Sequence, residues 1–275
     1  MNPATKTPEN ALCILGIPFD ENSSFRKGAL GGPARIRESY ISDSANLWTE
    51  TGIDLGNHGN LFDVGDVDCS GKTAETFHRI TDSVKTLLDH NNRVISLGGD
   101  HSVTFPVIRA FADYYPNLNI LHLDAHPDLY DSLKDNPLSH ACPFARIMEQ
   151  KLAGRLVQAG IRTMTGHLRD QAEKFNVEVH EVRFGMDWLD SLEFEGPVYL
   201  SIDLDCMDPA FAPGVSHHEP GGLSSRQVID IIQKFKGQLI GGDIVELNPD
   251  RDFISMTAMT AAKLLKEMMG RILES

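Results

Sequence analysis

The strongest constraint on this chain is a set of four polar segments, each of which follows a short apolar run. The runs are VISL, NILHL, PVYLSI and QLI, and their composition is typical of buried strands. The segments that follow are GGDHS, DAHPD, DLD and DIVE, which contribute His101, Asp124, His126, Asp128, Asp203, Asp205 and Glu246. Placing so many carboxylates and imidazoles at strand ends is costly unless a cation offsets their repulsion. The pattern therefore predicts a site for divalent metals.

DAHPD is the most specific of these segments. Because a strand alternates its faces with every residue, Asp124, His126 and Asp128 point to one side if the strand geometry persists, and so do Asp203 and Asp205. GGDHS alone is equally typical of a helix cap, and a single D-x-D pair is usually solvated. Three potential ligands at alternate positions have little structural purpose. Together, the segments favour a two-metal hydrolytic site over a structural explanation.

Composition restricts the class of protein further. The chain has 275 residues, 41% of them hydrophobic, which is enough for one large domain or two small ones. It has no apolar run of roughly 18 residues, so we expect no membrane span. The start, MNPATKTPEN, lacks the pattern of a secretory signal, and we expect a cytoplasmic protein. The net charge of −14 disfavours nucleic acid and anionic membranes as partners and favours a cationic substrate.

Strand and helix patterns alternate along the chain without a linker or low-complexity segment. We expect strands at 11–17, 61–67, 93–98, 119–124, 155–161, 177–182, 197–203 and 238–244. We expect helices at 33–42, 72–90, 102–115, 143–152, 167–175, 224–236 and 254–271, the third beginning at a Ser102 cap and the last carrying an apolar stripe from Ile254 to Ile272. Such alternation predicts parallel strands in a single α/β domain over residues 1–275, of which residues 1–10 form a flexible N-terminal segment. An open sheet and a closed barrel both fit, and both place ligands at the carboxyl ends of strands.

Two irregular segments are expected to form the walls of the site. Residues 129–144 follow DAHPD directly and contain His140, and a loop leaving a metal site is a natural wall of a substrate cleft. A lone loop histidine is usually a surface residue, but the position of His140 beside the expected metals favours a catalytic role. In GVSHHEPGG, residues 214–222, we expect His217 and His218 to belong to the wall and not to bind metal.

The motifs also occur in the order and spacing of a known family. GIPFD, SSFRKGALGGPARIRE, GGDHS, DAHPD, SIDLDCMDPAFAPG and VELNP resemble the ureohydrolases, which include arginase, agmatinase, guanidinobutyrase and formiminoglutamase. The resemblance extends from about residue 11 to 270, and DAHPDLYD, SHACPFARIME and GVSHHEPGGLS are most similar to plant-type arginases. It implies a three-layer αβα sandwich with an open, mostly parallel eight-stranded sheet, two Mn²⁺ per chain, and a homo-hexamer or trimer.

The resemblance also implies a role for each site residue. One metal would be held by His101, Asp124, Asp128 and Asp203, and the other by Asp124, His126, Asp203 and Asp205, so that Asp124 and Asp203 bridge. Such a carboxylate-rich set suits Mn²⁺ better than Zn²⁺. Two divalent ions acidify a shared water, which can then attack a guanidinium carbon at neutral pH. We expect Asp128 to orient this water, Glu246 to pair with the guanidinium and His140 to give a proton to the leaving amine.

The tail of the substrate is less constrained by these motifs. Asn136 and Ser139, in the loop after DAHPD, are suited to bind a carboxylate. Animal arginases carry an acidic pair shortly after the GIR motif, whereas here Arg162 is followed by TMTGHLRD and the first acid is Asp170. The plant-like segments favour L-arginine, with agmatine or another guanidino acid as the alternative. A zinc deacetylase with the same fold and a non-catalytic binding protein are two further alternatives, and the complete ligand set counts against both.

Overall fold

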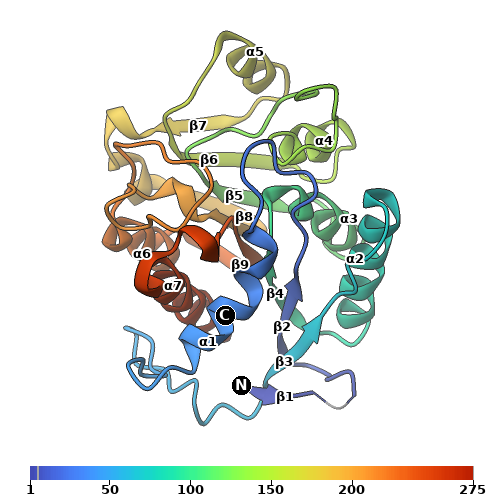
Figure 1. Ribbon diagram of the computed structural model, residues 1–275, viewed down its shortest axis with the longest axis vertical. Coiled ribbons are helices and arrows are strands. Elements are labelled where there is room, and N and C mark those ends of the chain that lie inside the picture. Colours follow the sequence, from blue (N-terminus) through green and yellow to red (C-terminus); the bar gives the residue numbers. More distant parts are fainter. Residues whose placement is uncertain (5, 275) are drawn as a thin grey trace.

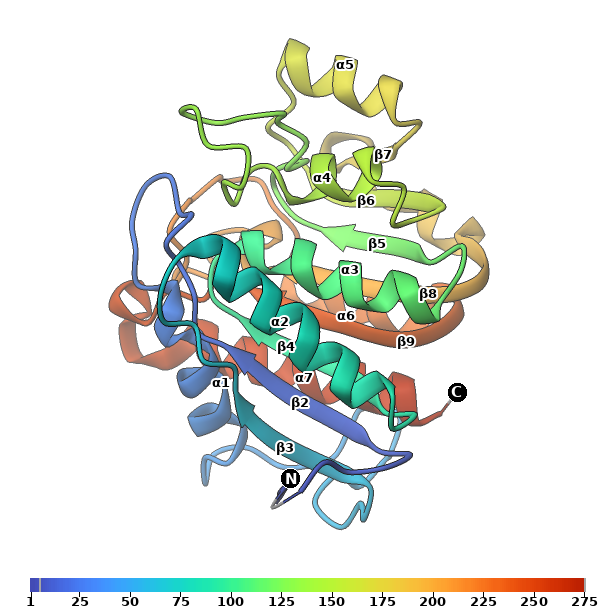
Figure 2. The same cartoon turned by 90° about the vertical axis from the view of Figure 1, so that its right-hand side faces the viewer.

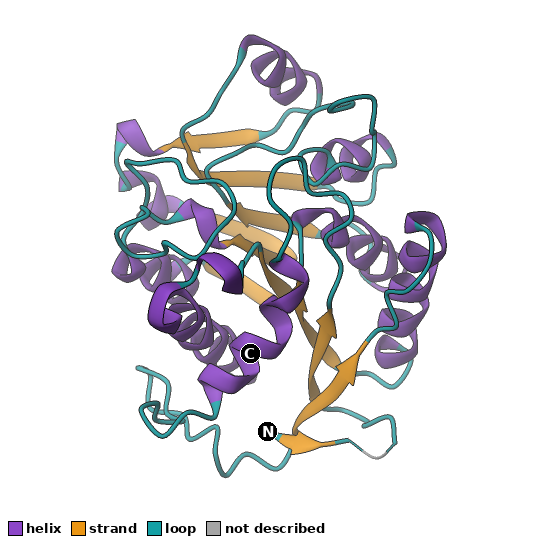
Figure 3. Cartoon of the chain, in the orientation of Figure 1, coloured by secondary structure: helices purple, strands orange, loops and turns teal. Residues whose placement is uncertain are grey.

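One open parallel sheet forms the centre of the molecule in the computed structural model, which describes residues 1–4 and 6–274 (Figures 1 and 3). Its strand order is β1-β3-β2-β4-β9-β8-β5-β6-β7. The strands are β1 (Asn2–Pro3), β2 (Leu12–Ile17), β3 (Leu61–Asp66), β4 (Arg93–Gly98), β5 (Asn119–Leu123), β6 (Arg155–Ile161), β7 (Glu178–Glu181), β8 (Glu193–Asp203) and β9 (Lys236–Val245). Every predicted strand is present, and the open sheet excludes a barrel.

Within the described residues the sheet has nine strands, one more than expected. The additional strand, β1, pairs with β3 through Asn2 and Pro3, within the segment that we expected to be flexible. Two residues carry no recognisable strand pattern, so β1 could not be predicted. All pairings in the sheet are parallel, which agrees with the expected strand–helix alternation.

Helices cover both faces of the sheet and produce three layers (Figure 2). On one face lie α1 (Gly32–Tyr40), α6 (Ser225–Lys234) and α7 (Met256–Leu273); on the other lie α2 (Thr73–Leu88), α3 (Thr104–Tyr114) and α4 (Pro143–Glu149). The remaining helix, α5 (Gly166–Lys174), lies near the β7 edge (Figure 1). Alternate residues of each central strand face opposite layers: Leu12 and Ile14 of β2 pack in the α1–α7 core, whereas Cys13 and Leu15 pack in the α2–α3 core.

Helix α7 starts two residues later than its apolar pattern predicts. Ile254, the first residue of the predicted stripe, has φ of 55° and its side chain is 73% exposed. Ser255 is also left-handed, so the regular helix starts only at Met256. From Ala258 to Ile272 the predicted stripe is buried against the sheet. Within the described residues, no helix is both long and apolar enough to cross a membrane.

Candidate active site

The predicted metal ligands come together at the carboxyl ends of four neighbouring strands, β4, β9, β8 and β5. His101 lies in the short 3-10 turn after β4, Asp124 directly follows β5, and Asp203 is the last residue of β8. The register pairs Asp203 with Val245, the last residue of β9, so Glu246 emerges at the same level. Segments that are far apart in sequence thus form one site at the sheet edge where ligands bind in open α/β folds.

The side chain of His101 lies at the centre of one cluster. Its Nδ1 is 3.1 Å from Asp124 Oδ2, 3.2 Å from Asp128 Oδ2 and 3.2 Å from Asp203 Oδ2. This nitrogen is buried and has no hydrogen-bond partner. A buried imidazole nitrogen that is unpartnered, with three carboxylates converging on it, fits a bound divalent cation. These four residues are the set expected to hold one metal.

A second cluster forms around His126, whose side chain is 32% exposed. Its Nδ1 lies 3.0 Å from Asp205 Oδ2 and 3.3 Å from Asp124 Oδ1. Asp124 therefore directs one carboxylate oxygen toward each cluster, as a bridging ligand would. The second oxygen of Asp203 accepts a 2.8 Å hydrogen bond from the backbone NH of Asp205, so bridging by Asp203 stays a prediction.

The electrostatics of the clusters also fit a cation. Burial, and then the charge of Asp124, raise the pKa of Asp128 to about 6. Burial and the neighbouring carboxylates Asp205 and Asp124 raise the pKa of Asp203 well above its ordinary value. Burial disfavours a charge on His126, but Asp205 and Asp124 outweigh it and raise its pKa to about 12. Against the effect of burial, the neighbouring histidines hold the pKa of Asp124 well below its usual range, whereas Asp128, Asp203 and Asp205 resist ionisation. The clusters therefore lack positive charge, which bound metal would supply.

Side chains behind the clusters orient the histidines, and these were missed in the sequence. Ser201 Oγ lies 3.0 Å from His101 Nε2 and donates a 2.6 Å hydrogen bond to the buried Asp243. Because this hydroxyl gives its own hydrogen to Asp243, it accepts one from His101 Nε2. With a cation bound among the carboxylates, this contact would leave the lone pair of His101 Nδ1 free to bind it.

His122 has a corresponding role at Asp124. Gln158 Nε2 donates to Pro127 O at 2.6 Å and to His122 Nδ1 at 3.0 Å, so the proton of His122 is on Nε2. That nitrogen lies 2.9 Å from Asp124 Oδ2 and donates to it. Burial lowers the pKa of His122 to about 4, in agreement with a neutral ring. His122 and Ser201 each lie on a strand two residues before a predicted ligand, a signal that could have revealed them.

His140 and Glu246, the predicted catalytic pair, are in direct contact. His140 Nδ1 lies 2.8 Å from Glu246 Oε1, which also accepts a 3.0 Å hydrogen bond from the backbone NH of His101. Burial disfavours a charged His140, but Glu246 outweighs this effect and raises the pKa of the histidine to about 9. The pair therefore holds a proton at neutral pH, next to the metal clusters.

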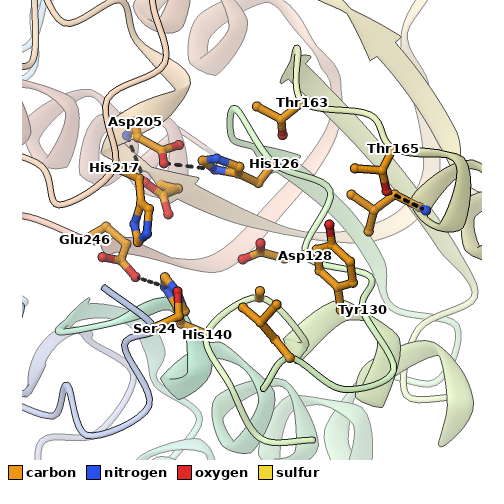
Figure 4. A pocket seen from close by; sticks show the side chains of 14 residues that line it. Ser24, His126, Asp128, Tyr130, His140, Thr163, Thr165, Asp205, His217 and Glu246 are labelled. Carbon is orange, nitrogen blue, oxygen red and sulfur yellow. Dashed lines mark hydrogen bonds and ion pairs between the residues drawn. The ribbon is translucent and has the colours of Figure 1, made fainter. Parts of the chain in front are cut away.

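A cavity of about 290 Å³ opens beside these groups (Figure 4). Asp128, Asp203, Asp205 and His126 line it on the metal side, together with His140 and Glu246. Tyr130, Thr163 and Thr165 line another part of its wall, and none of these was predicted. His217 also lines the cavity, as expected for a wall residue, whereas His218 is exposed and contacts Pro213 O and Arg251.

Asn136 and Ser139, predicted to bind substrate, do not line this cavity. Asn136 contacts Asn22 and accepts a 2.9 Å hydrogen bond from the backbone NH of Leu138. Ser139 is buried within the loop and accepts a hydrogen bond from the NH of Ala141. In the structure, both side chains hold the 129–144 loop in shape.

Two further local details differ from expectation. The DAHPD segment does not continue as a strand, because β5 ends at Leu123 and Asp128 has φ of 51°. Glu246, another predicted functional residue, is also left-handed, with φ of 67°. Such conformations are costly for side-chain-bearing residues and cluster at functional sites. After GGDHS, the cap is Asp100, which accepts from Ser102 N, and not Ser102 itself.

Buried carboxylates and histidines, a histidine–glutamate pair and an adjoining cavity define a metal-dependent hydrolase of the αβα class. The arginase family profile matches residues 10–270, and the chain belongs to this family. Rice mitochondrial arginase 1 (Oryza sativa) is 47% identical over 95% of this chain and 82% of its own length. The arginase structure from Medicago truncatula has a TM-score of 0.90 at 43% identity, covering 96% of this chain and 88% of that one. Agmatinase from Bacillus anthracis is 32% identical over 95% of this chain and 91% of its own length.

Proposed function

We propose that this protein is a binuclear manganese enzyme that hydrolyses L-arginine to L-ornithine and urea. The observation that carries the proposal is the His140–Glu246 pair, which lines the same cavity as the carboxylates of both clusters. In this proposal His140 would be the proton donor and Glu246 the anionic guanidinium partner, both beside the metal ligands. The similarity to proteins named plant arginases supports arginine as the substrate.

The ligand sets would hold one ion each, with Asp124 shared between them. When bound, the two ions would supply an acidified water for attack on the guanidinium carbon. Asp128 lines the cavity, where its carboxylate can accept a hydrogen bond from that water and orient it. Its left-handed backbone fixes the direction in which this side chain points.

Glu246 has two roles: it binds the guanidinium group, and it keeps His140 protonated. Its Oε1 is occupied by His140 and by the backbone NH of His101, whereas no hydrogen bond from the described residues reaches its Oε2. This second oxygen can accept from the guanidinium NH groups in a charge-assisted hydrogen bond. The same carboxylate keeps His140 protonated until the leaving amine needs a proton.

Away from the metal ligands and the predicted catalytic pair, the cavity wall is uncharged, with apolar Leu133 and Leu168 beside hydroxyl-bearing residues. Tyr130, Thr163 and Thr165 offer hydroxyl groups, which can donate to a carboxylate or accept from an ammonium group. This wall has the chemistry to bind the α-substituents of arginine and would also admit agmatine, which is therefore the alternative substrate. Agmatinases among the relatives, at 32% identity, support this alternative.

The experiment is a comparison of urea release from L-arginine, agmatine and 4-guanidinobutyrate by one Mn²⁺-loaded preparation. We expect the highest kcat/KM for L-arginine. A tenfold preference for agmatine, about 1.4 kcal/mol of transition-state discrimination, would replace the arginase proposal with the agmatinase one.

We also propose manganese as the bound metal, a homo-hexamer or trimer as the assembly, and the cytoplasm as the compartment. Metal analysis should find two Mn²⁺ per chain, and light scattering should give three or six times the chain mass. The relatives from rice and Medicago truncatula are named mitochondrial. Fractionation of the native cells therefore tests the compartment, and recovery of the protein in an organelle would overturn that part of the proposal.

A further inference from the structure

Both ring nitrogens of His140 already have partners in the protein. Nδ1 lies 2.8 Å from Glu246 Oε1, and Nε2 lies 2.9 Å from the hydroxyl of Ser24. The histidine ring is nearly buried, and neither nitrogen is left without a protein partner to face a substrate. A proton that leaves His140 must therefore break one of these contacts or pass through one of them.

The Ser24 contact leads to the cavity. Ser24 lines the cavity and lies beside His140 in Figure 4; it contacts Nε2 of the ring, whereas Glu246 contacts Nδ1. Hydrogen bonds hold the surrounding segment: Lys134 Nζ donates a 2.8 Å hydrogen bond to Ser24 O, and the NH of His140 donates a 3.1 Å bond to Asn22 O. The Asn22 NH in turn donates to the buried Asp100. Ser24 thus both contacts His140 and lines the cavity.

The Glu246 contact is an unfavourable route. Moving Nδ1 away from Glu246 would leave a buried carboxylate oxygen with only the NH of His101, and would remove the group that keeps His140 charged. A hydroxyl, by contrast, can accept one proton and release another without moving or acquiring a net charge. The geometry therefore favours transfer on the Nε2 side.

We propose that Ser24 relays the proton from His140 to the leaving amine. As the C–N bond of the tetrahedral intermediate breaks, its electron pair stays on the amine nitrogen. That nitrogen takes the proton of Ser24 Oγ, while Ser24 Oγ takes the proton of His140 Nε2. His140 ends neutral, Ser24 ends as a neutral hydroxyl, and the amine leaves with one added proton. The inference rests on the proposed guanidine hydrolysis and assigns the group that touches the reacting nitrogen.

The chain offers a matched control next to this residue. Ser23 is adjacent in the same loop, and its hydroxyl is buried without a hydrogen-bond partner. The test compares Ser24→Ala with Ser23→Ala, and with Ser24→Thr, which restores a hydroxyl. Each variant is loaded with Mn²⁺, and metal content, melting temperature, KM and kcat are measured.

A second substrate separates proton delivery from structural damage. L-Canavanine is the oxyguanidine analogue of arginine, and its leaving oxyamine is much less basic than an alkylamine, so its departure depends less on protonation. For Ser24→Ala we expect kcat on arginine to fall about tenfold or more, with a loss of less than about threefold on canavanine. Metal content, KM and the melting temperature should stay near wild type, and Ser24→Thr should recover most of the activity. Ser23→Ala should match wild type on both substrates.

Two results would overturn the inference. One is full arginine turnover by Ser24→Ala. The other is an equal loss on both substrates, which would show that Ser24 only supports the site. Failure of the proposed function is a separate outcome, because wild-type protein would then release no urea from arginine. In that case the same variants are compared on the guanidine that wild type does cleave.

Discussion

Substitution of Asp243 tests whether the side chains behind the metal ligands orient His101. This buried carboxylate accepts hydrogen bonds from Ser201 Oγ at 2.6 Å, and from Thr104 Oγ1 and Tyr199 OH, both at 2.8 Å. In Asp243→Asn, one of its two oxygens becomes an NH₂ group, which can only donate. At least one of the three hydroxyls then loses its acceptor. If this is Ser201, its hydroxyl can donate its hydrogen elsewhere and need not accept one from His101 Nε2. The hydrogen bond that orients the metal ligand His101 is then lost.

The expected magnitude follows from these contacts. Loss of one hydrogen bond to a buried charge corresponds to about 1.5–3 kcal/mol of unfolding free energy. Loss of an outer partner of a metal-binding histidine typically weakens metal affinity 10–100-fold, or about 1.4–2.8 kcal/mol. We expect both effects, measured by denaturant unfolding of the metal-free protein and by calorimetric titration with Mn²⁺.

The control for this prediction is Asp113→Asn, which removes an exposed carboxylate paired with Lys85. It should leave metal affinity unchanged, because Asp113 is exposed and lies at the end of α3 remote from His101. Metal affinity of Asp243→Asn within twofold of wild type would refute the reasoning. It would mean that the Asp243–Ser201 contact does not orient His101.

Four further outcomes are expected. Asp124→Ala should lose both ions, because one oxygen of this carboxylate faces each cluster; retention of one ion, by metal analysis, would contradict a bridging role. His140→Ala should lower kcat about 100-fold or more with metal content unchanged, and metal loss would instead make His140 a ligand. Metal affinity should fall as pH drops through about 6, because Asp128, with a pKa of about 6, then takes up a proton that competes with the cation; titration at pH 5 and 7 checks this. Activity should fall as pH rises through about 9, where His140, with its pKa of about 9, loses the proton it donates; a pH–kcat/KM profile that is flat there would contradict this.

Much of the fold and the ligand set could be predicted from local sequence. Alternating apolar runs locate the strands, and ligands at strand ends must meet if the strands are parallel neighbours. The order of the strands could not be predicted in this way, because β4 and β5 are consecutive in sequence yet are separated by β9 and β8 in the sheet. Only long-range packing decides this arrangement.

Which loop side chains line the cavity depends on the path of each loop, and no local sequence pattern predicts that path. Asn136 and Ser139 have suitable chemistry, but the turn of their loop directs them away from the cavity. Ser24 comes from a loop more than a hundred positions before His140, and no spacing rule connects them. His122 is an exception, since its position two residues before Asp124 on β5 was visible in the sequence.

The strand order has a consequence for how the chain acquires its metal. The binding site exists only when β4, β9, β8 and β5 are adjacent, and these strands span residues 93–245. Closing such long loops is slow, so the site forms late in folding. Metal then binds the native chain and not the unfolded one, and at a hundredfold excess over Kd each ion adds about 2.7 kcal/mol of apparent stability. Chelation should accordingly accelerate proteolysis at the centre of the sheet, far from any chain terminus.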